Sequence, residues 1–225
     1  ALGQLAGGIA HELRRPLSVI SNATFLLNAQ LDDKDPDVAE SLTLLDEEVH
    51  RADHIITDLL EFGRTGKAEQ VDVSLPALVD GVLSRHPPPE GITTQPHMPD
   101  QLPPAHVDPG HIRQVLTNLI KNAYEAMPEG GQLSVIGEKH TGDQLLLTVA
   151  DTGMGIPRED REKIFEPLFT TKQRGIGLGL AISKSLVEAN DGRIEVESEI
   201  DEGTTFRMYL PARPRARCAK TRTPR

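Results

Sequence analysis

Two long runs of apolar residues, spaced at intervals of three and four, constrain this chain more than any other feature. The first run occupies residues 2–31 and the second residues 38–59. Residues at such intervals fall on one face of an α-helix. Between the runs, LDDKDPD at 31–37 breaks the pattern and places a capping Asp35 beside Pro36. The chain is therefore predicted to begin with a helical hairpin, which Gly63 and Gly66 close.

Two helices cannot bury these stripes by themselves. In the second run the steps alternate between four and three, which is the heptad spacing of packed helices. The positions are Val38, Leu42, Leu45, Val49, Ala52, Ile56 and Leu59. A homodimer in which two hairpins form a four-helix bundle is the most economical way to cover them.

Composition excludes several classes of function. The 225 residues include 34 acidic and 24 basic side chains, and the net charge of −10 argues against a general nucleic-acid binder. Aromatic residues make up only 3%, so a platform for stacking bases is not expected. The single cysteine, Cys218, leaves no disulfide framework and no cysteine metal cluster. No apolar run reaches the roughly 18 residues of a membrane span and no signal peptide is recognisable, so we expect a soluble, cytoplasmic chain.

The last residues differ from the rest in charge. Residues 212–225 are rich in arginine and lysine, lack an apolar period and follow a strand-like segment. We expect a disordered, solvated basic tail. An electrostatic contact with an acidic partner or nucleic acid is the alternative interpretation.

His11 lies off the apolar stripe of the first helix, between Ile9 and Leu13, so its imidazole is predicted to face solvent. Glu12 follows it directly, and Pro16 removes a helical hydrogen bond one turn later and favours a kink. An isolated exposed histidine on a helix is usually only a solvated side chain. Any role for His11 therefore depends on the rest of the chain.

Residues 71–211 show the mixed pattern of an α/β domain, after a polar linker at 64–70. A strand followed by a helix capped by Ser74 is expected first, and then a strong amphipathic helix over 108–127. Strands are predicted at 132–140 and 143–150 around Thr141 and Gly142, and a second hairpin at 192–199 and 204–211.

Three polar features of this domain suggest a ligand. Asn118 and Asn122 are one turn apart on the polar face of the 108–127 helix, where carboxamide oxygens could contact Mg²⁺ or phosphates. Asp151 ends a strand before Gly153 and Gly155, and its carboxylate could accept a hydrogen bond from an amino group such as that of adenine. Solvated asparagines and a structural Asx turn remain the simpler interpretations.

The third feature is a glycine-rich loop. Gly175, Gly177 and Gly179 precede a helix at 180–189, which suits phosphate binding, and Lys172 and Arg174 add positive charge. A Rossmann loop is excluded, because no apolar strand directly precedes the glycines and no acidic ribose reader follows in a βαβ setting.

In order along the chain, these segments resemble the motifs of sensor histidine kinases. GGIAHELRRPLSVI is similar to the phosphoacceptor box, and NLIKNAYEAM, DTGMGI, FEPLF, GIGLGLAIS and GTTF to the N, G1, F, G2 and last nucleotide boxes. The resemblance covers residues 1 to about 211. It implies an α hairpin that forms a dimeric four-helix bundle, followed by an α/β sandwich (Bergerat-type) ATP-binding domain. It also implies four segments: residues 1–63, a linker at 64–70, residues 71–211 and the tail at 212–225.

The resemblance implies a role for each motif residue. His11 would be the phosphorylated nucleophile and Glu12 the group that holds or removes its proton. Asn122 would ligate Mg²⁺, Asn118 would contact phosphate and Asp151 would read adenine. The remaining ATP-binding residues would be Gly153, Gly155, Ile156, Lys172, Arg174, Gly177, Leu178, Gly179 and one of Thr204 or Thr205, of which Thr205 is our candidate. Residues 168–177 would form a mobile lid.

The activity so implied is ATP-dependent autophosphorylation of His11 and transfer of the phosphoryl group to an aspartate of a response regulator. The cofactors would be ATP and Mg²⁺, and the partners a second copy, a receiver domain and an upstream sensor domain that this chain lacks. We expect the receiver domain to dock around His11, near Leu17, Val19 and Ile20. Arg15 departs from the family, which often has Asn or Thr at this position, a position tied to dephosphorylation of the partner.

Two alternatives stay open. Gyrase, Hsp90 and MutL ATPases share the nucleotide fold but carry a water-activating Glu at the position of Asn118, and an amide cannot act as a general base. A free ATPase would release phosphate steadily without labelling the protein. A non-catalytic dimer that only binds nucleotide would fail to label His11.

Overall fold

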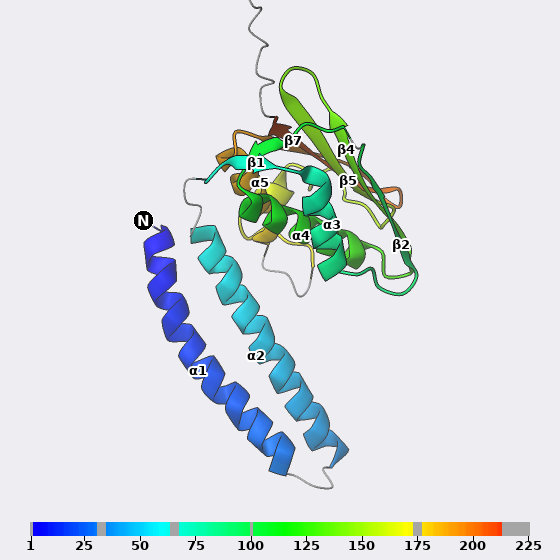
Figure 1. Cartoon of the computed structure of the whole chain (residues 1–225). Coiled ribbons are helices and arrows are strands. Elements are labelled where there is room, and N and C mark those ends of the chain that lie inside the picture. The colour runs from blue at the N-terminus through cyan, green and yellow to red at the C-terminus, as the bar shows by residue number, and fades with distance from the viewer. Residues whose placement is uncertain (1, 31–34, 64–67, 100, 173–176, 213–225) are drawn as a thin grey trace, which may run out of the picture. The chain divides into compact units, whose positions relative to one another are not determined.

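Both predicted helices of the N-terminal hairpin are present in the computed structural model (Figure 1). The structure describes residues 2–30, 35–63, 68–99, 101–172 and 177–212, and for residues 2–12, 54–55 and 57–63 only the backbone. The chain divides into two compact units: Ala1–Gly66 with Glu166–Ile182, and Lys67–Phe165 with Ser183–Arg225.

The hairpin consists of α1 (Leu2–Gln30) and α2 (Pro36–Gly63). As predicted, α2 begins after Asp35, whose Oδ1 accepts a hydrogen bond from the backbone N–H of Asp37 at 3.1 Å. Helix α1 continues through Pro16. None of the helices that the structure describes is both long and apolar enough to cross a membrane.

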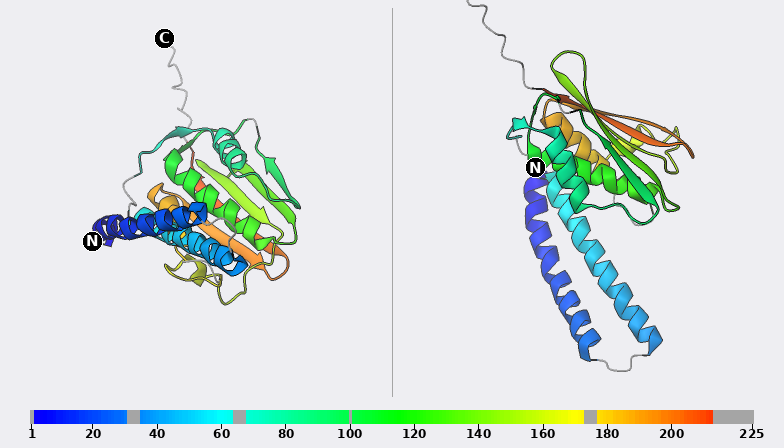
Figure 2. Two further views of the ribbon diagram at one scale, coloured as in Figure 1. Left: turned by 90° about the horizontal axis from the view of Figure 1, so that it is seen from below. Right: turned by 45° about the vertical axis from the view of Figure 1, so that its right-hand side comes forward.

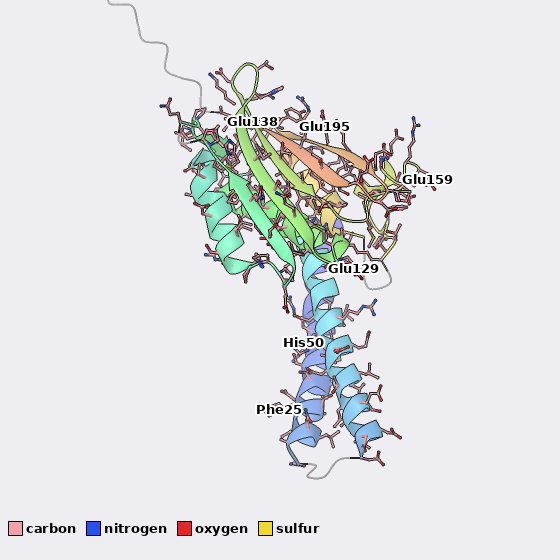
Figure 3. The ribbon with its side chains drawn as sticks, turned by 90° about the vertical axis from the view of Figure 1, so that its right-hand side faces the viewer. Phe25, His50, Glu129, Glu138, Glu159 and Glu195 are labelled. Carbon is pink, nitrogen blue, oxygen red and sulfur yellow. The ribbon has the colours of Figure 1, made fainter. Side chains whose placement is uncertain are left out.

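The apolar stripes of the hairpin are only half covered. One row faces the other helix and is buried, as at Thr24, Leu42 and Ile56 (4–6% exposed). A second row is left 41–49% exposed: Leu13, Ile20, Leu27, Val38 and Leu45. Phe25, outside both rows, is more exposed still, at 72% (Figure 3). The hairpin alone therefore does not bury the stripes that the sequence predicts.

The second unit is built on a five-stranded sheet in the order β2-β4-β5-β7-β6. Only the β2–β4 pair is parallel. The strands are β2 (Ile92–His97), β4 (Gly131–Lys139), β5 (Gln144–Asp151), β6 (Arg193–Glu199) and β7 (Gly203–Pro211). A small antiparallel ribbon pairs β1 (Val71–Val73) with β3 (Ala105–Val107).

Helices α3 (Leu75–Arg85), α4 (Pro109–Ala126) and α5 (Gly179–Ala189) cover one face of this sheet (Figure 2), and a short 3₁₀ turn lies at Lys163–Phe165. The buried face of α4 and alternate residues of β4 and β5 form the core between the layers, with exposed fractions of 0–2%. The other face of the sheet carries charged side chains such as Glu138 and Glu195 (Figure 3). This is the predicted two-layer α/β arrangement, which follows from strands that alternate and helices with one apolar face.

Two details differ from the sequence analysis. Strands β2 and β3 lie inside the proline-rich passage at 86–109, which gave no strand signal. Pro96 is tolerated because β2 is the edge strand of the sheet. Ala212, which was expected to begin the tail, is 7% exposed, forms a bridge to Ala105 and donates its N–H to the carbonyl of Asp143. Residues 213–225 lie outside the described residues.

Candidate functional site

Asp151 ends β5 as a nearly buried carboxylate that is 9% exposed. Its Oδ1 accepts the backbone N–H of Gly153 at 2.9 Å and that of Thr204 at 3.2 Å. Burial raises the pKa of Asp151, and these two hydrogen bonds oppose the shift. Both bonds use one oxygen, so Oδ2 is available to accept a bond from a ligand amino group.

The loop after Asp151 is joined to the turn between β6 and β7. Ile156 donates its N–H to the Ser198 hydroxyl at 2.8 Å, and Ser198 donates to the carbonyl of Gly203 at 2.7 Å. Asp201 N–H also reaches the carbonyl of Met154 at 3.0 Å. The predicted pocket residues Gly153, Gly155 and Ile156 are thus held against the last two strands.

Two glycines make this close approach possible. Gly155 has φ 71° and Gly203 has φ 105°, both in the left-handed region. A Cβ on Gly155 would overlap the carbonyl of Glu199, and one on Gly203 the carbonyl of Asp151. The loop therefore presents bare backbone at the place where the resemblance implies an adenine.

The two candidate threonines of β7 differ in their position relative to Asp151. Thr204 is 5% exposed, donates its N–H to Asp151 and lies 3.0 Å, hydroxyl to hydroxyl, from Ser198. Thr205 is the next residue of the strand, so its side chain points to the opposite face of the sheet. The structure brings Thr204, and not Thr205, to Asp151.

Asn118 and Asn122 lie together on α4, as predicted. Asp108 caps the N-terminus of this helix, since its Oδ1 accepts the N–H groups of Gly110 at 2.8 Å and His111 at 3.2 Å. The Nδ2 of Asn122 approaches Oδ1 of Asn118 at 3.5 Å, and the Nδ2 of Asn118 donates to the Ser183 hydroxyl at 2.9 Å. Both asparagines are half-buried.

The donor set of this helix face fits Mg²⁺ that is shared with phosphates. Such ions commonly take one or two protein oxygens and complete their shell with phosphate oxygens and waters. Among the described residues there is no cluster of three or more histidine, cysteine, aspartate or glutamate side chains that would form an all-protein metal cage. An asparagine oxygen on α4 is compatible with an ion that takes one or two protein oxygens and completes its shell with phosphate oxygens and waters.

The glycine-rich segment is described in part. Leu168, at φ 69°, donates its N–H to the carbonyl of Gly177 at 2.9 Å, which joins the two ends of the predicted lid. Leu178 is buried and Gly179 is the first residue of α5, so the helix begins directly at the motif. Lys172 is exposed. Arg174 lies outside the described residues.

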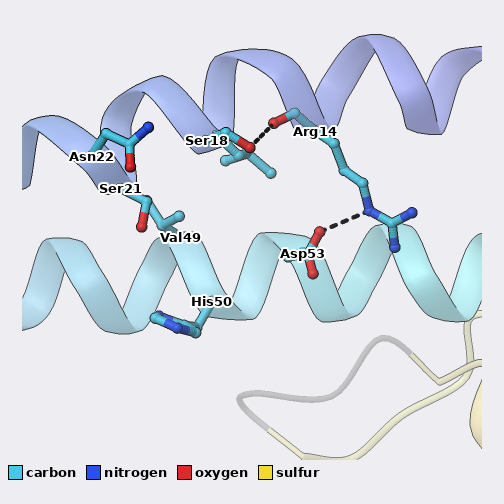
Figure 4. Close-up of a pocket in the computed structure, with 8 residues that line it drawn as sticks. Arg14, Ser18, Ser21, Asn22, Val49, His50 and Asp53 are labelled. Carbon is cyan, nitrogen blue, oxygen red and sulfur yellow. Dashed lines mark hydrogen bonds and ion pairs between the residues drawn. The ribbon is translucent and has the colours of Figure 1, made fainter.

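His11 and Glu12 lie within α1, but their side chains are outside the described residues. The next turn of α1 is tied to α2, because Arg14 Nε pairs with Asp53 Oδ1 at 2.9 Å (Figure 4). A groove of about 300 Å³ runs beside this pair. It is lined by Arg14, Leu17, Ser18, Ser21, Asn22, Val49, His50 and Asp53. Val19 and Ile20, the other predicted docking residues, are 68% and 43% exposed.

Sequence reasoning missed Ser183 and Ser198. Both are polar residues at inward-facing positions: Ser198 follows Ile194 and Val196 in β6, and Ser183 lies on the buried side of α5. The available signal was a polar residue at a position where the periodicity of the helix or strand predicts an apolar one.

Comparison with known families identifies two domains in the chain. Residues 1–67 match the family model described as "His Kinase A (phospho-acceptor) domain". Residues 107–214 match "Histidine kinase-, DNA gyrase B-, and HSP90-like ATPase".

Individual proteins are also similar. Sporulation kinase E of Bacillus subtilis (strain 168) is 32% identical over 96% of this chain and 29% of its own length. The crystal structure of full-length ShkA in complex with AMPPNP has a TM-score of 0.77 at 26% identity and covers 96% of this chain and 47% of that one. Histidine kinase ThkA in complex with the response regulator protein TrrA has a TM-score of 0.67 at 27% identity, with 96% and 63% covered. The chain spans less than half of the length of the first curated relatives.

Proposed function

Because the chain belongs to the sensor histidine kinases, we propose that it is an ATP-dependent protein-histidine kinase that phosphorylates its own His11 and passes the phosphoryl group to an aspartate of a response regulator. Residues 1–63 are the dimerisation and phosphotransfer domain in this proposal. Residues 64–70 are the linker, and residues 71–211 bind ATP. Sequence similarity to proteins that are named histidine kinases supports the assignment.

The observation that carries the proposal is the cradle at Asp151. A buried carboxylate, fixed by two N–H groups and bordered by backbone that only glycine allows, is suited to a flat ligand with an exocyclic amino group. The asparagines of α4 supply the amide groups for Mg²⁺ and phosphate. When bound, MgATP supplies the γ-phosphoryl group.

The chemistry at His11 follows from its side chain. A neutral imidazole nitrogen attacks the γ-phosphorus, and a nitrogen–phosphorus bond forms as the bond to the leaving ADP oxygen breaks. The carboxylate of Glu12 accepts a hydrogen bond from the N–H of the other ring nitrogen and thereby stabilises the cationic ring, which keeps this proton. The phosphoryl group then moves to a carboxylate oxygen of the response regulator and leaves His11 neutral again.

Asn118 separates this activity from that of a free ATPase. Its amide nitrogen is not basic, so the cradle lacks a group at this position that could activate water. ATP should therefore be held with little hydrolysis until His11 reaches it. A non-catalytic scaffold is less well supported, because the sequence retains all the nucleotide motifs together with the phosphoacceptor box around His11.

The partners follow from the hairpin. The exposed row at Leu13, Ile20 and Leu45 is the face that a second copy would cover to complete a four-helix bundle. A receiver domain would dock beside His11, and the related ThkA was crystallised with a response regulator. A sensor domain that receives the input signal would be the third partner.

The direct test is labelling with γ-³²P-ATP in the presence of Mg²⁺. The wild-type chain should acquire acid-labile label, and His11→Gln should abolish it. His50→Gln is the matched control, since His50 is an exposed histidine of the same hairpin, and should label normally. Label that survives His11→Gln would refute the assignment, and steady phosphate release from an unlabelled protein would revive the ATPase alternative.

A further inference from the structure

Ser183 of α5 places a hydroxyl group among buried apolar side chains. It is 1% exposed, beside Ile182, Leu186 and Val187, which are also buried. Its hydroxyl oxygen lies 2.9 Å from Nδ2 of Asn118. We propose that Ser183 is a positioning residue, which sets the orientation of the Asn118 carboxamide and through it that of Asn122. This inference rests on the proposed function of the two asparagines.

The contact with Ser183 acts first on the carboxamide of Asn118. A carboxamide has an acceptor end and a donor end of nearly the same shape, and a half-turn about its last bond exchanges them. The contact with Ser183 engages the donor end, so Oδ1 of Asn118 points along the helix to Asn122. Because Ser183 is 1% exposed, removing its hydroxyl takes away the acceptor of Asn118 at a place that bulk water reaches poorly.

The orientation of Asn118 in turn affects Asn122. Its Nδ2 faces Oδ1 of Asn118 at 3.5 Å. In a planar amide the oxygen lies on the other branch, so Oδ1 of Asn122 is turned away from Asn118. An oxygen is what a hard cation requires, whereas an outward amide NH₂ would present hydrogens to it. The two successive contacts, from Ser183 to Asn118 and from Asn118 to Asn122, therefore turn the oxygen end of the Asn122 amide outward for metal binding.

Residues that hydrogen-bond to a metal ligand commonly affect metal binding in this way, because they fix which atom of the ligand faces the metal. A serine that merely satisfied a buried hydrogen bond would affect folding alone. A serine that orients Asn122 should affect the Mg²⁺-dependent part of nucleotide binding in particular.

The test is titration of a fluorescent ATP analogue and of ADP, with Mg²⁺ and in EDTA, on the intact chain. Ser183→Ala should weaken Mg²⁺-dependent binding roughly tenfold and raise the Mg²⁺ concentration at half-saturation, with binding in EDTA nearly unchanged. Ser183→Thr retains a hydroxyl and should restore most of the affinity. Ser185→Ala, on the same helix, controls for helix propensity and should behave as the wild type.

Equal losses with Mg²⁺ and in EDTA would overturn the proposal and leave Ser183 a structural residue. So would an unchanged Mg²⁺ dependence in a folded Ser183→Ala chain, with folding checked by thermal unfolding. If Ser183→Ala does not fold, the comparison is made between Ser183→Thr and Ser183→Cys, and equal Mg²⁺ dependence in these two and the wild type overturns it. Failure of the nucleotide-binding role of the two asparagines, on which this inference rests, looks different, because the wild-type chain would then bind no ATP analogue under any of these conditions.

Discussion

The hairpin and the sandwich use the same kinds of apolar side chain with opposite outcomes. On α4, Leu116, Leu119 and Ile120 are at most 1% exposed. On the hairpin, Ile20 and Leu45 are 43% and 49% exposed, although they occupy equally regular stripes. A helix that packs on a sheet finds a complete apolar surface within one chain, whereas a two-helix hairpin offers each helix only one neighbour. We infer that the sandwich folds as a self-sufficient unit and that the hairpin needs a second copy.

The largest expected effect is in the core of the sandwich. Leu116→Ala should lower the free energy of unfolding of that unit by about 2–5 kcal/mol, because it leaves a cavity at a fully buried position. Chemical denaturation followed by circular dichroism measures this change. The loss should not depend on protein concentration, and a strong dependence would show that the sandwich is not self-sufficient.

The next effect separates ligand binding from stability at Asp151. Asp151→Asn should weaken binding of an ATP analogue by roughly 10- to 100-fold, since hydrogen bonds to charged groups contribute about 1.5–3 kcal/mol. Burial raises the pKa of Asp151, so keeping it ionised at neutral pH costs folding free energy. The unfolding free energy of Asp151→Asn should therefore equal or exceed that of the wild type. A matching loss of stability would mean that the carboxylate is structural.

A smaller effect is expected at the hairpin. Leu45→Ala removes a half-exposed side chain from each copy and should weaken dimerisation by about 2 kcal/mol per dimer, at roughly 1 kcal/mol for each half-buried leucine. Analytical ultracentrifugation measures the dissociation constant. Leu44→Ala is the control, because Leu44 is 51% exposed but lies outside both rows. Equal effects of the two changes would contradict the proposed seam.

The smallest effect is a pH dependence confined to the nucleotide site. Adenine recognition needs the ionised form of Asp151, and its raised pKa means that protonation begins at a less acidic pH than for an ordinary aspartate. Affinity for the ATP analogue should fall as the pH is lowered from 7 toward 4. In Asp151→Asn the same titration should be flat over the part of the range that protonation of Asp151 controls in the wild type, while the oligomeric state of both proteins stays unchanged there.

Local patterns were enough to predict the helices, the two hairpins of the sheet and the proximity of Asn118 to Asn122, because these depend on periodicity along one segment. The same patterns could not choose between Thr204 and Thr205. That choice depends on the register by which β7 pairs with β5 and places Thr204 opposite Asp151. Strand β2 was missed for a related reason, since its pairing with β4 and its edge position make Pro96 acceptable. Ser183 and Ser198 gain their partners only from elements distant in sequence.

The joined loop and turn at Asp201 have a consequence for protein engineering. A surface hairpin is usually a safe place for an inserted tag. Between β6 and β7 an insertion would pull Met154, and with it the loop after Asp151, out of place. The turn between β4 and β5 offers a better choice, because nothing lies within 4 Å of the position that a side chain on Gly142 would take. A reporter inserted beside Gly142 should leave nucleotide affinity intact.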